Sequence, residues 1–159
     1  MNKPADLYEQ DFVLWAEEQA RALRQAAHSG ANLPLDWENL AEEIESLGRR
    51  DRRELRSRIQ RVIEHLLKLE CSPALDPRPG WRTTIRRERQ EIEMILEDSP
   101  SLRRQVGEIV SEKTADAIES LEPELASHGE LTEAAKATLA SVNYGPEQVL
   151  GDWWPDTKA

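Results

Sequence analysis

One apolar stripe in the middle of the chain constrains the fold more than any other feature of the sequence. Large apolar side chains recur there at steps of three and four, the spacing of one face of an α-helix. The stripe is interrupted only around residues 48–52, where Gly48 costs about 1 kcal/mol in a helix interior. We therefore predict one long helix over residues 36–71, spanning roughly 50 Å if it is unbroken at Gly48. Its apolar positions are Trp37, Leu40, Ile44, Leu47, Leu55, Ile59, Val62, Leu66 and Leu69.

Local signals delimit this helix and the one before it. Asp36 is placed as an N-cap, between two leucines that can form a hydrophobic staple. Upstream, aromatic and alanine residues at helical spacing, followed by Gly30, predict a first helix over about residues 6–28. Residues 72–80 contain three prolines, which indicates a connection, because proline lacks the amide donor that regular structure needs.

Three further helices are predicted downstream. Residues 81–98 carry an apolar face of tryptophan, isoleucine and leucine. Ser99 and Pro100 are typical of an N-cap followed by the first helical position, and the helix that they begin is expected to end at Pro123. Thr132 is expected to cap a short fifth helix.

The chain is long enough for one domain with an ordinary core, at 159 residues. No alternating strand pattern occurs, and the tail ends in Trp153-Trp154, which we expect to pack back because adjacent indoles are costly to leave in water. We predict a single all-α domain over residues 1–159. It is an antiparallel helical bundle of four main helices, the second one long, plus a short C-terminal helix and tail.

Charge is segregated along the sequence. Residues 1–48 carry 3 basic and 10 acidic side chains, residues 49–104 carry 15 and 10, and residues 105–159 carry 3 and 11. The segments are therefore −7, +5 and −8, which together give the net charge of −10. We interpret the basic centre as neutralised by neighbouring acidic helices, while contact with nucleic acid is the alternative and is disfavoured by the net charge. The central arginines are Arg49, Arg50, Arg52, Arg53, Arg56, Arg58 and Arg61.

The sequence bears on the cellular compartment only through features that it lacks. A single cysteine, Cys71, cannot form an intramolecular disulfide, and no secretory signal begins at Met1. The longest apolar runs are far short of the roughly 20 residues needed to cross a bilayer. We therefore expect a cytoplasmic protein with no membrane span, and we read Cys71, at the C-terminal end of a helix, as an inert thiol.

The sequence contains several ordered motifs: Leu7-Tyr8, Asp11-Phe12, Trp15, Trp37-Glu38-Asn39-Leu40, Glu43-Ile44-Glu45, Leu47-Gly48, His65-Leu66-Leu67-Lys68, Trp81 with Ile85, Arg89 and Ile92, and Pro100-Ser101-Leu102. With these motifs the chain resembles a bacterial family known as domain of unknown function twenty-nine. They cover nearly the whole chain, and together they are specific although each alone is weak. The resemblance implies a small, soluble, helical protein and carries no catalytic residues onto this sequence.

A candidate polar cluster comprises Glu43, Glu45, His65, Glu88 and Arg89. Arg89 falls inside the apolar stripe of its helix, where a lone guanidinium would be costly, so we expect an acidic partner from Glu43 or Glu45. Such an ion pair more often fixes helix register than performs catalysis. Glu88 resembles a residue on a solvated face.

His65 is the one metal-ligand candidate. It lies at the edge of the long apolar stripe, where a histidine is more often hydrogen-bonded to a neighbour than used as a ligand. Histidine with glutamates suits zinc, iron or manganese. If the long helix is continuous, however, Glu45 and His65 are about 30 Å apart and cannot share a site. No histidine has a glutamate three residues before it, as di-iron bundles require, and Asp11 is expected to be simply exposed.

The leading functional hypothesis is a non-enzymatic helical interaction or regulatory module, with a protein partner or self-association. The alternative is a metal-dependent hydrolase or oxidase that uses His65 with glutamates. A second alternative is nucleic-acid contact through the arginines of residues 49–61. No cofactor is predicted, and a divalent metal belongs only to the enzymatic alternative.

Overall fold

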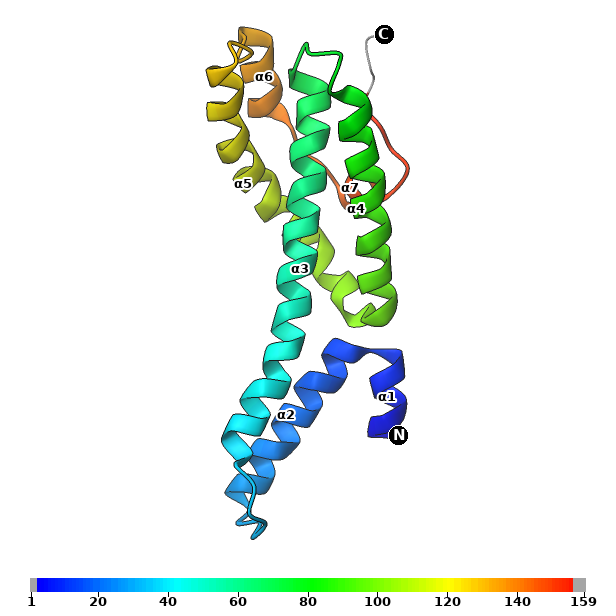
Figure 1. Cartoon of the computed structure of the whole chain (residues 1–159), viewed down its shortest axis with the longest axis vertical. Coiled ribbons are helices and arrows are strands. Elements are labelled where there is room, and N and C mark those ends of the chain that lie inside the picture. The colour runs from blue at the N-terminus through cyan, green and yellow to red at the C-terminus, as the bar shows by residue number, and fades with distance from the viewer. Residues whose placement is uncertain (1–2, 156–159) are drawn as a thin grey trace. The chain divides into compact units, whose positions relative to one another are not determined.

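The computed structural model describes residues 3–155, which form seven α-helices, one 3-10 helix and no strand (Figure 1). This confirms the predicted all-α class. The described residues divide into two compact units, which are treated in turn: unit 1 contains residues 3–55 and 94–104, and unit 2 contains residues 56–93 and 105–155. This division does not test the single domain expected from the sequence, which stays a prediction.

The first helical region of unit 1 is broken after its seventh residue. Helix α1 covers Pro4–Gln10 and helix α2 covers Phe12–His28, so the prediction of one helix over residues 6–28 is wrong at this point. Asp11 separates the two with extended backbone angles and caps α2, since its carboxylate accepts a hydrogen bond from the Leu14 amide at 2.9 Å.

The Asp11 carboxylate also accepts two hydrogen bonds from a residue far away in the sequence. Ser101 donates to it through its amide at 2.7 Å and through its hydroxyl at 2.9 Å. Asp11 is consequently buried, not exposed as expected. The helix breaks here because one carboxylate caps α2 and fastens the 94–104 segment, roles that require it to leave the helical backbone.

Helix α3 (Trp37–Cys71) is continuous, as predicted. Its N-cap is also confirmed, because the Asp36 carboxylate accepts a hydrogen bond from the Asn39 amide at 3.3 Å. Gly48 lies where α3 approaches α2: a Cβ atom at this position would be 3.7 Å from Ala16 Cβ and from Val13. The glycine therefore marks a close approach of two helices and not a break.

Small residues form the seam of a hairpin made by α2 and the first half of α3, which run side by side in opposite directions (Figure 1). Ala16 and Ala20 of α2, and Ala41 of α3, are at most 1% exposed. Because these side chains are short, the helices pack closely and the larger apolar side chains lie on the flanks of the seam.

Helix α4 (Arg78–Asp98) begins within the segment 72–80 that was predicted to be a connection. Its first turn contains Pro79, and the Trp81 amide donates to the Pro77 carbonyl at 3.0 Å. Prolines are tolerated there because the first amides of a helix have no intrahelical acceptor. Three prolines in this segment were therefore compatible with a helix start.

The chain after Ser99 forms two elements where one was predicted. A 3-10 helix, η1 (Pro100–Gln105), leads into helix α5 (Val106–Ser127). The helix passes through Pro123, so the predicted end at that residue is wrong. Leu121 and Leu125, 1% and 3% exposed, anchor both sides of the proline in the core, which compensates for the hydrogen bond that it removes.

Two short helices complete unit 2. Thr132 caps helix α6 (Glu133–Ser141), as predicted, by accepting a hydrogen bond from the Ala135 amide at 3.1 Å. Helix α7 (Pro146–Leu150) was not predicted, because five residues are too few to reveal a helical period.

The two units differ in their cores. In unit 1 the buried positions of the hairpin seam are mostly small, whereas unit 2 buries large aliphatic side chains from four helices. Among residues 3–155, no helix combines the length and the apolar character that crossing a bilayer requires. The fully buried large residues of unit 2 include Ile59, Val62, Ile63, Leu66, Leu67, Ile85, Ile92 and Leu121.

Candidate functional site

Glu88 is the centre of a buried ion cluster in unit 2. Its side chain is 6% exposed and lies between two arginines of α3. Arg58 donates to one carboxylate oxygen and Arg61 to the other, each at 2.9 Å. Burial raises the pKa of Glu88, but the two guanidinium hydrogen bonds outweigh burial and hold the pKa below its usual value. Glu88 is thus an anion that ties α4 to α3, and its expected place on a solvated face is wrong.

Arg89, the next residue of α4, is directed to the C-terminal tail. Its Nε donates to the Val149 carbonyl at 2.9 Å, and its Nη2 donates to the carbonyls of Gln148 and Trp153, both at 2.8 Å. Carbonyls at the end of a helix carry partial negative charge, so they can stabilise a guanidinium. Burial lowers the pKa of Arg89, and the nearby Asp152 carboxylate opposes this shift. Backbone carbonyls therefore fill the role that was expected of an acidic side chain.

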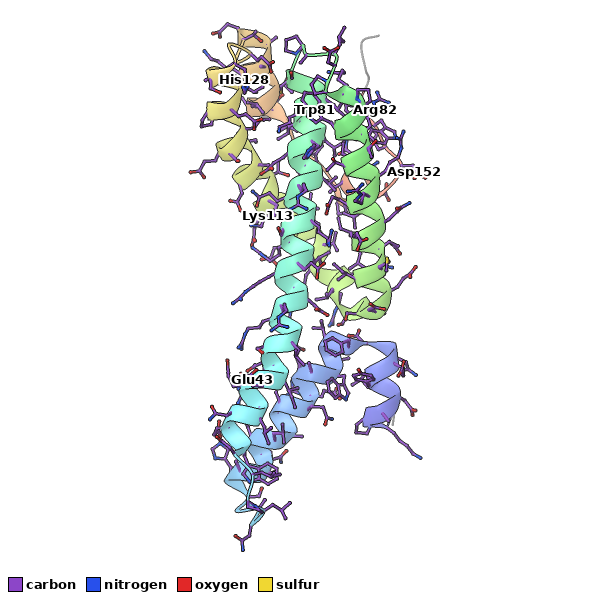
Figure 2. The ribbon with its side chains drawn as sticks, in the orientation of Figure 1. Glu43, Trp81, Arg82, Lys113, His128 and Asp152 are labelled. Carbon is purple, nitrogen blue, oxygen red and sulfur yellow. The ribbon has the colours of Figure 1, made fainter. Side chains whose placement is uncertain are left out.

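The acidic residues expected to partner Arg89 have other surroundings in unit 1. Glu45 accepts a hydrogen bond from Arg24 at 2.8 Å and lies 3.4 Å from Arg49. The hydrogen bond from Arg24 lowers the pKa of Glu45, against a smaller opposing effect of burial. Glu43 is exposed on α3 (Figure 2). The predicted polar cluster is consequently divided, with Glu43 and Glu45 in unit 1 and the other members in unit 2.

His65 is hydrogen-bonded within its own helix. Its Nδ1 donates to the Arg61 carbonyl at 2.7 Å, and burial lowers its pKa although this hydrogen bond opposes the shift. The metal-dependent alternative requires at least two carboxylates around His65. Within residues 3–155, no three His, Cys, Asp or Glu side chains converge closely enough to hold a metal ion. The geometry therefore gives that alternative no ligand set.

Most of the arginines in the central cluster are paired with carboxylates. Arg52 pairs with Glu17 of α2, and Arg56 pairs with Glu112 of α5. Together with the pairs that Arg58 and Arg61 make with Glu88 of α4, these contacts confirm the predicted neutralisation by neighbouring helices. Arg49 pairs within its own helix, with Glu42. Nucleic-acid contact would require these guanidiniums to face an open surface, so the alternative loses most of its donors.

The two sides of the α2–α3 hairpin differ in polarity. Successive residues of an α-helix are rotated by about 100°, so each helix presents different side chains on either side of the seam. One side contains the ion pairs that Arg24 and Arg52 make across the two helices. On the other side of the seam, α3 presents leucine and isoleucine side chains. On that side α2 presents phenylalanine, tryptophan and leucine. The helices are antiparallel and their charged sides meet, so their apolar sides also lie on a common face.

Large apolar side chains are exposed at both ends of this face. At the α1 end, the Tyr8 ring packs edge-on against Trp15 at a centroid distance of 4.9 Å and is 49% exposed. Nearer the loop, Leu40 is 40% exposed, and the loop residues Leu35 and Leu33 are 47% and 62% exposed. We call the set Leu23, Leu40, Ile44 and Leu47 the hairpin apolar face; none of its members is fully buried.

A cavity of about 200 Å³ lies in unit 2 and is lined by Trp81 and His128, among others (Figure 2). Two of its charged groups are engaged with each other, because Lys68 pairs with Glu124 at 3.0 Å. His128 Nδ1 donates to the Glu124 carbonyl at 2.8 Å, and Glu130 also lines the cavity. The Lys68 cation is thus already held by a carboxylate.

The sequence reading missed a second polar feature of unit 2. Arg82, Arg86 and Arg89 of α4 all lie around the Trp154 ring of the tail, which confirms that the tail packs back. The arginines are spaced by four and three residues, so a basic stripe on one helical face was the available signal. Trp153 also packs there, with its ring centroid 5.8 Å from that of Tyr144.

Comparison with known proteins agrees with this fold. A helical protein of unknown function from Rhodospirillum rubrum, solved by crystallography at 1.45 Å resolution, matches with a TM-score of 0.68. It shares 21% sequence identity, and the match covers 93% of this chain and 98% of that one, which supports the fold alone. No curated protein matches the chain. Residues 7–154 match the family described as Domain of unknown function DUF29, and the chain belongs to that family.

Proposed function

We propose that the protein is a non-enzymatic helical interaction module that pairs with a second copy of its own chain through the hairpin apolar face. The observation that carries this proposal is the exposure of large apolar side chains on one side of a two-helix layer. Amphipathic helices are stable when a further layer buries their apolar stripes. Fully burying one exposed leucine contributes about 1.5–3 kcal/mol. Leu40 is exposed and the other three members are partly buried, so each of those three contributes less, and the eight side chains of two copies together supply the driving force.

Charge on α3 favours a second copy in antiparallel orientation as the occupant. Glu43 and Arg50 lie beside the hairpin apolar face, are exposed, and make no ion pair within residues 3–155. They are two helical turns apart on α3. When two copies of α3 pair antiparallel about a two-fold axis next to Leu47, Glu43 of each copy lies opposite Arg50 of the other. A symmetric dimer requires this kind of self-complementary surface.

Sedimentation velocity of the full chain over a wide concentration range tests the proposal. We expect a reversible species of twice the 18.2 kDa chain mass. Leu40→Glu introduces a charge into the buried interface and should weaken the dimer by about tenfold or more. Leu75→Glu is the matched control, because Leu75 is 71% exposed and belongs to unit 2. A chain that remains monomeric, or a dimer that Leu40→Glu leaves unchanged, would refute the proposal.

A charge exchange tests the partner and the register together. Glu43→Arg and Arg50→Glu, made singly, place like charges opposite each other twice in the dimer and should weaken it. The double variant restores both pairs with reversed sign, so its dimerisation should recover toward the wild-type level. If the double variant is as weak as the sum of the single ones, α3 does not pair in this register. Circular dichroism of each variant checks that the helical fold is retained.

A further inference from the structure

Three cations of α4 surround one indole ring in unit 2. The guanidinium carbons of Arg82, Arg86 and Arg89 are 5.3, 5.2 and 5.0 Å from the centroid of the Trp154 ring. An indole ring has two faces, so at least two of the three cations lie on the same face. Like charges on one face of a ring repel each other, and an anion placed beside them relieves the repulsion.

Two of these arginines have hydrogen-bond donors to offer. Arg89 is committed to the three carbonyls of the tail. Arg82 and Arg86, by contrast, form no ion pair with a carboxylate of residues 3–155. A guanidinium that stacks on an aromatic face still presents its N–H groups at its edge. Arg86 is exposed and therefore accessible to a ligand from solvent.

A cavity of about 370 Å³ lies beside this cluster, a volume at the lower end of the range of ligand sites. Arg86, Arg89 and Trp154 line it, and so does Asp152, which reaches it from the tail. Asp152 is exposed, and Figure 2 shows it in the same region of unit 2 as Arg82. Glu93 of α4 lines the cavity as well. The cavity thus combines a cationic part, an aromatic part and two carboxylates.

We propose that this cavity binds a small zwitterion of the free α-amino-acid type, with its carboxylate on Arg86 and its ammonium group near Asp152. A guanidinium can hold a carboxylate through two parallel hydrogen bonds, and Trp154 offers an apolar surface to the ligand side chain. A phosphate dianion would be repelled by the Asp152 carboxylate, and a simple amine would be repelled by the arginines. A zwitterion, in contrast, can pair its carboxylate with an arginine and its ammonium group with Asp152. This inference is independent of dimerisation through unit 1.

Isothermal titration calorimetry of the full chain with each of the common free amino acids tests the inference. Acetate, methylammonium and inorganic phosphate serve as probes of one charge alone. We expect saturable binding of one or more amino acids, with each single-charge probe at least about tenfold weaker. No binding of any amino acid, or binding of acetate or phosphate as tight as that of the best amino acid, would overturn the proposal.

Paired substitutions assign the binding to this cavity. Arg86→Gln and Asp152→Asn should each weaken binding of the best amino acid by about tenfold. The matched controls are Arg87→Gln and Asp76→Asn, which remove the same charges from exposed positions outside the cavity and should leave binding unchanged. Equal affinities of the Arg86→Gln and Arg87→Gln variants would contradict the proposed site.

Nuclear magnetic resonance of the indole N–H groups supplies a second readout that does not depend on heat. The chain has five tryptophans, and a Trp154→Phe variant identifies the signal of Trp154. The bound amino acid should shift the Trp154 signal more than the other indole signals, with the same saturation curve as the calorimetry. A shift centred on Trp81 instead would place the ligand in the other cavity and refute the assignment.

Discussion

Replacing Glu88 by glutamine should destabilise unit 2 by about 3 kcal/mol, because charge-assisted hydrogen bonds are among the stronger polar contacts in a protein. The change removes the one carboxylate that Arg58 and Arg61 share, while it keeps the size of the side chain. Glutamine retains one acceptor oxygen, and its amino group turns a donor toward the second guanidinium. One hydrogen bond is therefore weakened and the other is lost.

The magnitude follows from the exposure of the three side chains. The pair between Glu88 and Arg58, 6% and 22% exposed, is shielded, so its loss costs about 2 kcal/mol. Arg61 is 50% exposed, and screening by water reduces its share to about 0.5–1 kcal/mol. In a chain of this length, the sum corresponds to a decrease in Tm of about 6–12 °C.

Urea unfolding at several pH values measures both the size and the origin of the effect. The pKa of Glu88 is lowered in the folded chain, so the stability that its charge contributes is present above the unfolded pKa, near 4.3. That stability is lost as the pH falls through the lower, folded pKa. The Glu88→Gln variant does not titrate at this position. The stability difference between wild type and variant should accordingly be constant from neutral pH to about pH 5 and shrink below about pH 4.

Glu91→Gln is the matched control on the same helix. Glu91 lies 3.9 Å from Arg58 and is 43% exposed, so its loss should cost less than about 0.5 kcal/mol. Equal destabilisation by the two variants would show that the shielding of Glu88 does not matter, and a loss for Glu88→Gln that persists unchanged at low pH would refute the charge as its cause.

Three further outcomes are expected. Gly48→Ala should raise the free energy of unfolding, measured by urea titration, by about 0.5–1 kcal/mol. Alanine has the higher helix propensity, and its Cβ would meet its neighbours at 3.7 Å, an ordinary contact distance. A loss of stability would mean that the helices cannot accommodate the added methyl group. Asp11→Ala should lower the free energy of unfolding by about 2–3 kcal/mol, since the N-cap of α2 and two hydrogen bonds from Ser101 disappear together. A loss below about 1 kcal/mol would mean that only the N-cap contributes to stability. Burial, with the nearby Glu70 charge, raises the pKa of Cys71 to about 11. Because the thiolate is the reactive form, iodoacetamide at pH 8 should alkylate Cys71 about a hundredfold more slowly than free cysteine. A rate near that of free cysteine would contradict the raised pKa.

Features with local causes could be predicted from the sequence. The N-caps at Asp36 and Thr132 depend on residues three positions away, so short motifs identify them. The continuity of α3 could also be predicted, because a stripe that spans both sides of Gly48 outweighs the propensity of one glycine. These parts of the fold need no knowledge of distant neighbours.

Features with distant causes could not be predicted in the same way. Asp11 leaves the helix because its partner Ser101 is 90 residues away, and no local pattern indicates that contact. The prediction that Arg89 needs a partner was correct, but a helical pattern indicates side-chain partners only. The acceptors of Arg89 include the carbonyls at the end of α7, a helix too short to be recognised from the sequence.

Adjacent residues of α4 hold two different parts of unit 2. Glu88 and Arg89 differ by about 100° around the helix, so one is directed to α3 and the other to the tail. Because both are buried or half-buried and satisfied by several hydrogen bonds, α4 fixes the position of the Trp154 ring relative to α3 before any ligand arrives. Arg86, one turn earlier on the same side as Arg89, is exposed and can reorient. The proposed zwitterion site therefore consists of a rigid wall, Arg89 with Trp154, and two exposed charged side chains, Arg86 and Asp152. The ordering cost of binding falls on these two side chains alone, which makes a small ligand with few contacts sufficient.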